Sequence, residues 1–162
     1  MQTDSVTTAR WIALLLPLAL IGGALGSQFI GHLVPCEMCM WQRWPHYAAI
    51  LVAALAFIVP DRRLTIALVA VAGLLIGFSG FIGGFHAGVE YHWWPGITAC
   101  TAPIDHSLSG MDMIDAIRRG PLVRCDLAQW TLFGVSLAGF NAIISSIGAL
   151  TIFALLLRGR RA

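Results

Sequence analysis

The sequence predicts an all-α membrane protein, a single domain over residues 1–162 built as a bundle of four transmembrane helices. The composition supports this class, because the 162 residues are 58% hydrophobic and only 11% charged, which is too apolar for a soluble domain. A spanning helix needs about 20 mostly apolar residues, and runs of roughly that length occur four times. The predicted spans are residues 11–34, 41–59, 64–89 and 132–157.

The charged residues exclude one broad class of function. The chain has no lysine, and its ten positive charges are all arginines, against eight acidic residues. The formal net charge is only +2, and no basic stretch stands out. We therefore exclude a nucleic-acid-binding role, which requires a concentrated basic surface.

The first span, residues 11–34, has a second interpretation. Arg10, the apolar run and the small residues "GGALGS" at 22–27 are also the ingredients of a cleaved secretory signal. The apolar region of such a signal is usually about 7–15 residues long, and this one is longer. We therefore expect a retained transmembrane helix.

The second span is the shortest of the four. From Pro45 to the residue before Pro60 there are 15 residues, or about 22 Å of helix, against a hydrocarbon core of about 30 Å. Its helix is therefore predicted to begin upstream, near the pair Cys36 and Cys39, with Pro45 as a kink inside it.

The arginines predict which way the chain crosses the membrane. Six of the ten lie in the N-terminal tail, in residues 60–63 and in residues 158–162, so the positive-inside rule places these segments in the cytoplasm. The outer segments are then residues 31–44 and the loop 90–131. All four cysteines of the chain lie in these two outer segments: Cys36, Cys39, Cys100 and Cys125.

The long outer loop is predicted to carry one short helix. Ser109 and Asp112 fit a capping box, and Gly120-Pro121 ends the pattern. We expect this helix to lie in the membrane interface rather than in solvent. Its apolar residues recur every three positions: Leu108, Met111, Ile114 and Ile117.

The cysteines give the clearest functional signal. Outside the cytoplasm thiols are expected to be oxidised and paired, and four cysteines allow three pairings. Two static disulfides that brace loops are one interpretation, and it is reasonable for Cys100 and Cys125. It is poor for Cys36 and Cys39, because so small a ring removes little chain entropy. A C-x-x-C is better suited to redox exchange.

Metal chemistry is less well supported by the spacing. Two cysteine pairs can form a tetrahedral zinc site, but the second pair lacks a close C-x-x-C spacing. Covalent haem needs a histidine directly after the second cysteine, where this chain has Met40. We therefore predict no metal site.

Two further residues, Arg43 and His86, are candidates beside the cysteines. Arg43 lies four residues after Cys39 and so on the same helical face. It can be an interfacial arginine with its stem in lipid, or a cation that stabilises a Cys39 thiolate. His86, near the outer end of the third span, can be a packing residue or a functional polar group in the membrane. The other histidines are predicted to be interface or loop residues: His32, His46, His92 and His106.

Three features together resemble the disulfide bond formation protein B family, DsbB. They are the segment "PCEMCMWQR" at 35–43, the cysteine pair of the long loop, and "CDLAQWTLFGVSLAGFNAI" at 125–143. The resemblance covers nearly the whole chain, in order and in the number of spans. It implies a quinone-linked thiol oxidase of the bacterial inner membrane, with both termini in the cytoplasm and the cysteines in the periplasm.

The resemblance also implies a route for the electrons. A reduced DsbA-like thioredoxin-fold protein would attack the disulfide Cys100–Cys125 and form a mixed disulfide through Cys100. Cys125 would then attack Cys36 and release Cys39 as a thiolate, which donates to a bound ubiquinone or menaquinone beside Arg43. His86 matches the place where the family has a histidine near the quinone.

The sequence departs from the best-known members of that family at Glu37, Met38 and Pro45 and in the composition of the loop. The loop leaves the partner open, because a sister branch serves dedicated partners. A vitamin K epoxide reductase-like protein would have its C-x-x-C late in the chain. The alternative functions are a non-catalytic membrane scaffold with structural disulfides and, third, a metal-binding membrane protein.

Overall fold

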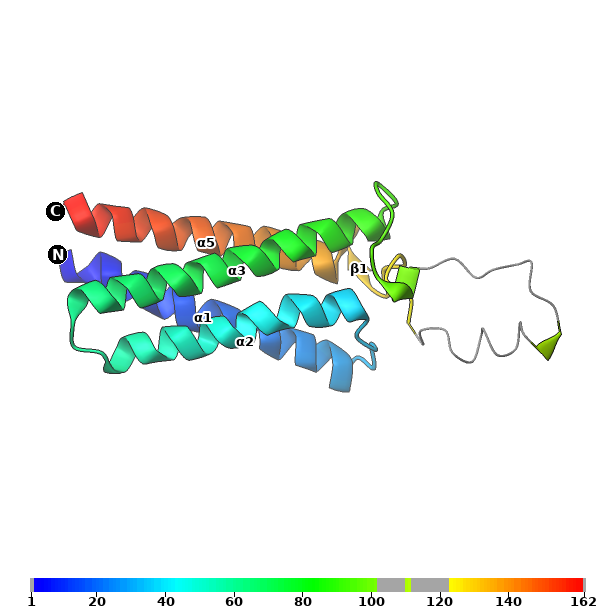
Figure 1. Cartoon of the computed structure of the whole chain (residues 1–162), viewed down its shortest axis with the longest axis horizontal. Helices are drawn as coiled ribbons and strands as arrows, with labels where there is room; N and C mark the ends of the chain where they lie inside the picture. Colours follow the sequence, from blue (N-terminus) through cyan, green and yellow to red (C-terminus); the bar gives the residue numbers. More distant parts are fainter. Residues whose placement is uncertain (1, 102–109, 112–122, 162) are drawn as a thin grey trace.

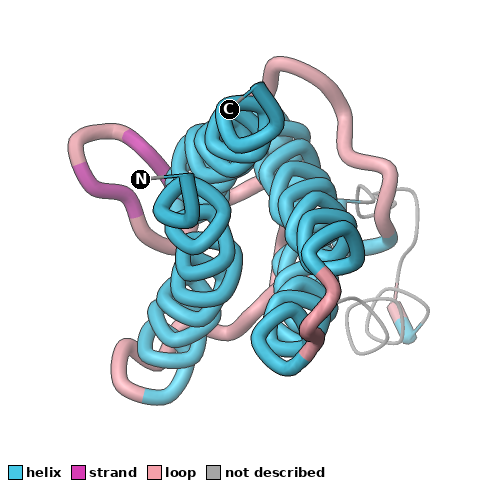
Figure 2. The backbone as a smooth tube through the Cα atoms, turned by 90° about the vertical axis from the view of Figure 1, so that its left-hand side faces the viewer, coloured by secondary structure: helices cyan, strands magenta, loops and turns pink. Residues whose placement is uncertain are grey.

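The computed structural model describes residues 2–101, 110–111 and 123–161 of the 162-residue chain. Within these residues four long helices run side by side (Figures 1 and 2). They are α1 (Gln2–Phe29), α2 (Glu37–Ile58), α3 (Arg62–Glu90) and α5 (Leu137–Arg161). The predicted interfacial helix of the outer loop falls on residues 108–120, most of which lie outside the described residues.

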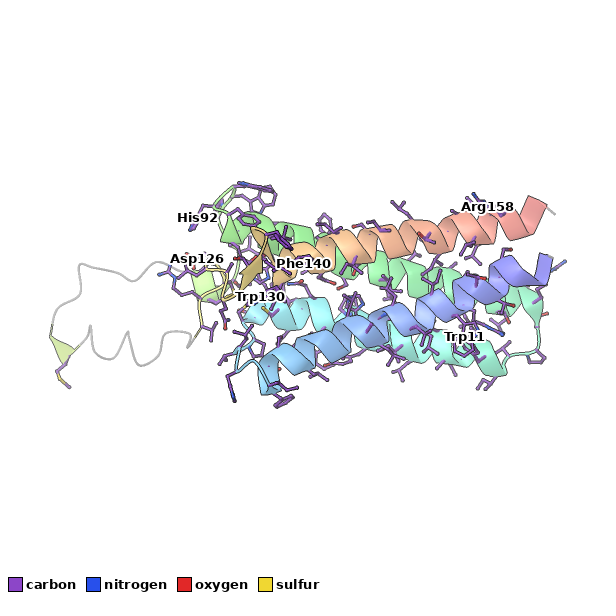
Figure 3. The ribbon with its side chains drawn as sticks, turned by 180° about the vertical axis from the view of Figure 1, so that it is seen from behind. Trp11, His92, Asp126, Trp130, Phe140 and Arg158 are labelled. Carbon is purple, nitrogen blue, oxygen red and sulfur yellow. A yellow bond between two sulfur atoms is a disulfide. The ribbon has the colours of Figure 1, made fainter. Side chains whose placement is uncertain are left out.

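Both termini lie at one end of the bundle, and the connections that carry the cysteines lie at the other (Figure 1). Figure 3 shows the same division in single residues, with Trp11 and Arg158 toward the first end and His92, Asp126 and Trp130 at the second. This arrangement follows from an even number of long helices that run alternately up and down the bundle. It places the two cysteine-bearing segments together.

Three of the described helices are long and apolar enough to cross a membrane: Ser5–Phe29 within α1, α3, and Leu137–Gly159 within α5. The second predicted span corresponds to α2, which does not belong to this set. Its first three turns carry polar side chains, among them Gln42, Arg43 and His46. The bundle is helical as predicted, and the fourth span remains a prediction.

The predicted and observed ends differ most at the first helix. α1 ends at Phe29, five residues before the apolar run does. His32 has a φ of 55°, a left-handed conformation that closes a helix, and Leu33 N–H donates back to the Ser27 carbonyl at 3.0 Å. The second helix begins at Glu37 and runs through Pro45, upstream as expected.

A small hairpin precedes α5, which an all-α fold does not include. β1 (Thr131–Leu132) pairs antiparallel with β2 (Val135–Ser136). The turn residues Phe133 and Gly134 have φ of 51° and 77°, as a two-residue hairpin turn requires. The hydroxyl of Tyr91, the C-cap of α3, donates to the Gly134 carbonyl at 2.7 Å and accepts from Ser136 N–H at 2.9 Å. The hairpin is thereby tied to the end of α3, and it delays the start of α5 to Leu137.

Glycines allow α3 and α5 to pack closely, as small residues do between membrane helices. A Cβ added to Gly80 would meet the Ser145 Cβ at 3.0 Å, and one added to Gly83 would meet the Ala138 carbonyl oxygen at 2.9 Å. The contact brings residues of α5 against the middle of α3. It is this contact that places Asn141 inside the bundle.

The buried core is divided along the bundle. A larger cluster of alanines and aliphatic residues, including Ala9, Ala53, Val69 and Ile152, fills the half toward the termini. A second cluster consists of Cys36, Met38, Val89, Cys100 and Cys125. Sulfur is thus concentrated in the core at the opposite end.

Candidate active site

Both cysteine pairs meet in this second cluster. Cys36 is 5% exposed, Cys100 4% and Cys125 0%, although they come from three separate segments of the chain. Cys39 is partly buried against the same cluster. The predicted site cysteines are therefore brought together in one place.

The first pair stands at the start of α2. Cys36 is the N-cap, and its Sγ accepts a hydrogen bond from the Cys39 backbone N–H at 3.3 Å. Both cysteines are free thiols, and the Cys36 thiol donates toward Cys39 Sγ at 2.8 Å. This contact with Cys39, with burial as the second cause, raises the pKa of Cys36. The pair can close without a change of backbone, since the helix already holds the sulfurs side by side.

The second pair is a disulfide between Cys100 and Cys125, with a Cα–Cα distance of 5.5 Å. Cys100 lies in a short 3-10 turn, η1 (Ala99–Thr101), and its carbonyl accepts from Cys125 N–H at 3.3 Å. The Thr98 hydroxyl lies 2.8 Å from Cys100 Sγ and 3.7 Å from Cys125 Sγ. A bonded sulfur has no hydrogen, so the hydroxyl is the donor.

His86 lies between the two pairs. Its Nε2 is 3.6 Å from Cys36 Sγ and 3.2 Å from the Cys125 carbonyl oxygen, and Glu90 Oε1 is 3.8 Å away on the next turn of α3. This side chain therefore contacts one residue of each pair. A place beside a bound quinone remains a prediction for His86.

Arg43 is buried and held against α1. Its Nη1 donates to Gln28 Oε1 at 2.6 Å and its Nη2 to the Ala24 carbonyl at 3.2 Å. These two bonds fix the guanidinium one turn after Cys39. Arg43 is therefore a fixed cation inside the bundle. It does not have the arrangement of an interfacial arginine, whose stem lies in lipid.

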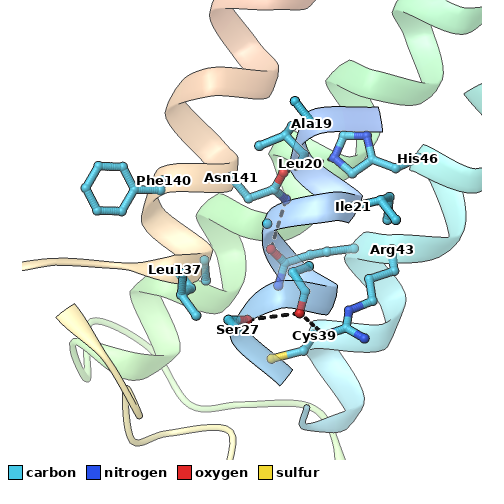
Figure 4. Close-up of a pocket in the computed structure, with 14 residues that line it drawn as sticks. Ala19, Leu20, Ile21, Ser27, Cys39, Arg43, His46, Leu137, Phe140 and Asn141 are labelled. Atoms are coloured by element: carbon cyan, nitrogen blue, oxygen red, sulfur yellow. Dashed lines mark hydrogen bonds between the residues drawn. The ribbon is translucent and has the colours of Figure 1, made fainter. Parts of the chain in front are cut away.

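A cavity of about 230 Å³ opens between α1, α2 and α5 (Figure 4). Its walls are mostly apolar, with Ala19, Leu20 and Ile21 from α1 and Phe140 from α5. The polar side chains on its walls are Ser27, Cys39, Gln42, Arg43, His46 and Asn141. A smaller cavity of about 60 Å³ is lined by Cys36, His86 and Glu90, and Cys39 and Arg43 line both. Cys39 therefore stands between the buried thiols and the larger cavity.

A buried hydrogen-bond network runs between the helices beside these cavities. Gln42 Nε2 donates to the Met38 carbonyl at 3.2 Å and lies 2.8 Å from His86 Nδ1. Asn141 Nδ2 donates to Gln42 Oε1 at 2.9 Å, and its Oδ1 lies 3.0 Å from His46 Nε2. The network connects α2, α3 and α5.

The prediction for His46 was wrong, because this side chain is 3% exposed and belongs to the network. Sequence reasoning also missed Gln28, Gln42 and Asn141. Each is a polar residue within an apolar helix, and such residues are seldom without a role in membranes. That signal was available in the sequence, although their partners were not.

The cysteines and His86 also satisfy one geometric test for a metal site. Among the described residues, the ligand atoms of Cys36, Cys39 and His86 lie within 4.8 Å of one another. However, the Gln42 amide nitrogen donates to His86 Nδ1, so Nε2 carries the hydrogen and has no free lone pair. A metal ion on Nε2 would move the hydrogen to Nδ1 and require Gln42 to reverse its amide. The reversal would set the Gln42 amide oxygen against the Met38 carbonyl, which now accepts from Gln42 Nε2, and this disfavours the site.

An exposed ion pair flanks the second cysteine pair. Arg124 Nε donates to Asp126 Oδ1 at 2.8 Å, and a second contact joins Arg124 Nη2 to Asp126 Oδ2. The hydrogen bond from Arg124 lowers the pKa of Asp126. Asp126 is therefore ionised at neutral pH beside Cys125.

Comparison with known proteins agrees with this site. The family described as disulfide bond formation protein DsbB matches residues 7–155. Proteins named "Disulfide bond formation protein B" are similar in Verminephrobacter eiseniae, with 29% identity over 88% of this chain and 81% of the relative, and in Polaromonas sp. strain JS666, with 31% identity over 76% and 74%.

A third such relative, from Polaromonas naphthalenivorans, is 27% identical over 86% of this chain and 84% of its own. No solved structure gives a significant match. The family match spans almost the whole chain, and the relatives are covered over most of their length. The chain therefore belongs to the DsbB family, and with its apolar helices it is an integral membrane oxidoreductase of disulfide bond formation.

Proposed function

We propose that this protein oxidises the dithiol of a periplasmic DsbA-like thioredoxin-fold protein and passes the electrons to ubiquinone or menaquinone. One observation carries the proposal: both cysteine pairs share one buried cluster, and Cys39 also lines an apolar cavity together with Arg43. Thiol exchange alone conserves the number of disulfides. A net gain therefore needs an acceptor that the cavity can hold.

The lining of the cavity fits a quinone head group in its chemistry. Its apolar walls suit a ring and the start of an isoprenoid tail, and α1 and α5 are both apolar helices that can face lipid. Arg43 offers donors for a carbonyl oxygen at the end nearest Cys39. A bound quinone would supply a two-electron, two-proton acceptor.

The residues around Cys39 favour its thiolate. Cys39 lies in the first turn of α2, where the helix dipole stabilises negative charge, and the Cys36 thiol donates toward its sulfur. Arg43 adds a buried cation on the next turn. These groups keep Cys39 as the electron donor, while Cys36 is left as the sulfur that exchanges with the second pair.

The proposed thiol exchange begins at the Cys100–Cys125 disulfide and ends at the Cys36–Cys39 pair. A thiolate of the partner attacks the Cys100–Cys125 disulfide and bonds to Cys100, which frees Cys125. Cys125 then attacks Cys36 of the closed first pair, and the Cys36–Cys39 bond breaks to leave the Cys39 thiolate. The partner's second thiol releases Cys100 as the partner's own disulfide forms. Cys100 then attacks Cys125 and displaces Cys36, which restores the Cys100–Cys125 disulfide and leaves Cys36 and Cys39 as a dithiol. That dithiol gives two electrons and two protons to the acceptor as its own disulfide closes.

His86 is a positioning residue in this exchange. Its Nε2–H contacts the Cys125 carbonyl and Cys36 Sγ, so it holds the two sulfur-bearing segments against each other. We place the protein in the bacterial inner membrane with α2 as the fourth span. Both termini are then cytoplasmic, and the cysteines face the periplasm.

The test uses the purified full chain in lipid nanodiscs with ubiquinone or menaquinone and a reduced thioredoxin-fold partner. We expect one quinone to be reduced for each partner disulfide formed, followed by quinone absorbance and by thiol counting. The Cys39→Ser variant is the control and should show neither change. If the wild-type chain oxidises no partner with either quinone, the protein is the scaffold with structural disulfides.

A further inference from the structure

The larger cavity has polar side chains, His46 and Asn141, that the proposed electron route does not use. Cys39, Arg43 and His46 are spaced at i, i+4 and i+7 on α2, so they lie along one helical face. All three line the cavity (Figure 4). His46 therefore lies one turn beyond Arg43, at the side of the cavity away from Cys39.

The hydrogen bonds around His46 determine which of its ring nitrogens carries the hydrogen. Gln42 Nε2 donates to the Met38 backbone carbonyl at 3.2 Å. A reversed amide would set two carbonyl oxygens against each other, so this orientation is fixed. Gln42 Oε1 is consequently the acceptor that faces Asn141.

The same reasoning fixes Asn141. Its Nδ2 donates to Gln42 Oε1 at 2.9 Å and to the Ser79 backbone carbonyl at 3.2 Å, and both of these groups are acceptors. Its Oδ1 therefore faces the Ser145 hydroxyl at 2.8 Å and His46 Nε2 at 3.0 Å. An amide carbonyl oxygen cannot donate, so neutral His46 carries its hydrogen on Nε2 and donates to Asn141 Oδ1.

The other ring nitrogen, Nδ1, then has a bare lone pair. It is buried and has no hydrogen-bond partner among the described residues. A buried acceptor without a donor is unfavourable and is uncommon in folded proteins. The His46 side chain lines the larger cavity, so a ligand there can supply the missing donor once the atoms that cover Nδ1 have moved aside.

The two redox forms of a quinone differ in this respect. The oxidised form has carbonyl oxygens, which only accept, whereas the reduced form has hydroxyl groups, which donate. We propose that His46 Nδ1 accepts a hydrogen bond from a hydroxyl group of the reduced quinone, so that the cavity binds the quinol more tightly than the quinone. This inference rests on the proposed function.

Such a preference would affect the reaction itself. A ligand site that favours one redox form shifts the equilibrium toward that form by the ratio of the two affinities. Electron transfer from the Cys36–Cys39 dithiol would therefore be drawn toward disulfide and quinol. His46 is a binding residue in this scheme and exchanges no electrons.

Binding can be measured without turnover in the full-length Cys36→Ser/Cys39→Ser variant, which cannot exchange electrons with the ligand. Calorimetric titration in nanodiscs, with a short-chain ubiquinone and with its quinol under anaerobic conditions, gives the two dissociation constants. We expect the quinol to bind about three- to tenfold more tightly, the effect of one hydrogen bond.

Substitutions at His46 separate ligand binding from packing. In His46→Gln the amide nitrogen takes the place of Nε2 and keeps the bond to Asn141, but the acceptor at Nδ1 is lost, so the two affinities should become equal. His46→Asn places an amide oxygen near the position of Nδ1 and should restore part of the preference. His92→Asn, at an exposed loop histidine, is the control and should leave the preference unchanged.

The outcomes distinguish the two proposals. Equal affinities in the parent, or an unchanged preference in His46→Gln, overturn the role of His46 and leave quinone use intact. If neither form binds the parent, quinone use fails and the inference fails with it.

A spectroscopic readout needs no substitution at His46. In the Cys36→Ser/Cys39→Ser chain labelled with ¹⁵N-histidine, at about pH 8, above the ordinary histidine pKa of about 6.5, the His46 signals should show an unprotonated Nδ1. Quinol should shift that signal, and quinone should not. A hydrogen found on Nδ1, or an equal response to both ligands, would refute the assignment.

Discussion

The two cysteine pairs differ in what holds them. Cys36 and Cys39 are placed by a regular helix, with the first sulfur as the N-cap and the second one turn along. Cys100 and Cys125 are placed by a 3-10 turn and a loop, and their own disulfide is the main link between those segments. The first pair keeps its geometry when open, and the second loses a connection when it opens.

This difference indicates a division of labour. A pair that stays aligned in both redox states suits repeated transfer to a small acceptor held in a fixed cavity. A pair whose opening releases chain segments suits exchange with another protein, which must reach a sulfur that is buried at rest. Cys39 of the helix pair lines the larger cavity, whereas both sulfurs of the loop pair are buried.

The largest expected effect comes from removing each of the two cysteine pairs in turn. In the Cys100→Ser/Cys125→Ser variant, oxidation of the protein partner should fall to the uncatalysed rate, whereas quinone reduction by a small dithiol such as dithiothreitol should persist. In Cys36→Ser or Cys39→Ser both reactions should stop. Quinone absorbance and partner thiol counts measure the two activities separately. Loss of the dithiothreitol reaction in the loop variant would contradict the division.

Removing the Arg43 cation should lower the reactivity of the Cys36–Cys39 pair and leave the Cys100–Cys125 pair unaffected. In Arg43→Ala the Cys39 thiolate loses a buried positive charge that helps the hydrogen bond from Cys36 to lower its pKa, so we expect quinone reduction at pH 7 to be about severalfold slower. Alkylation of Cys39 by iodoacetamide, followed against pH, should move to higher pH. Arg43→Lys should recover part of the effect, and Arg124→Ala, at the exposed arginine beside Cys125, is the control. An alkylation profile like that of the wild type would remove Arg43 from the mechanism.

Disturbing the contact between α3 and α5 should affect the cavity through packing. A Cβ at Gly83 would meet the Ala138 carbonyl oxygen at 2.9 Å and Asn141 Nδ2 at 3.0 Å, so Gly83→Ala should cost about 1–3 kcal/mol of stability and weaken ligand binding. At the neighbouring Gly84 the nearest atom is 3.9 Å away, and Gly84→Ala should be neutral or slightly stabilising. Thermal unfolding in nanodiscs compares the two, and equal unfolding temperatures would argue against this packing.

The smallest expected effect lies beside the loop pair. The lowered pKa of Asp126 means that its pairing with Arg124 stabilises the folded loop above the ordinary aspartate pKa. That contribution is lost as the pH falls through the lower value. In Arg124→Ala the pKa of Asp126 should return toward 3.8, as measured by carboxyl ¹³C NMR, with no change in activity at pH 7. A titration unchanged from the wild type would show that the pair is absent in solution.

The sequence predicted what depends on local pattern. Apolar runs indicated four long helices, and the short distance between Pro45 and Pro60 correctly placed the start of α2 near the C-x-x-C. The hairpin was missed because its turn is Phe133-Gly134, which lacks the Asn-Gly or Asp-Gly signal of such turns. The end of the first helix was predicted five residues too late, at 34 instead of Phe29, since hydropathy does not register the left-handed residue His32.

The polar network could not be predicted, because its members lie far apart in the chain. Asn141 is 99 positions from Gln42 and 95 from His46. Asn141 appeared as a lone polar residue in an apolar helix, and no local rule pairs it with Gln42 or His46. The same limit applied to Arg43. Helical spacing predicted that Arg43 lies near Cys39, but nothing in the sequence predicted its hydrogen bond to Gln28.

Gly23 of α1 gives the larger cavity an adjustable wall. It lines the cavity, and a Cβ added to it would meet no atom within 4 Å. A methyl group can therefore be added there without a clash, and it would take up room that an occupant would otherwise use. Alanine, valine and leucine at Gly23 would reduce the volume of the cavity stepwise. Binding to this series would show how large a head group the cavity accepts, and the cysteines would be unchanged.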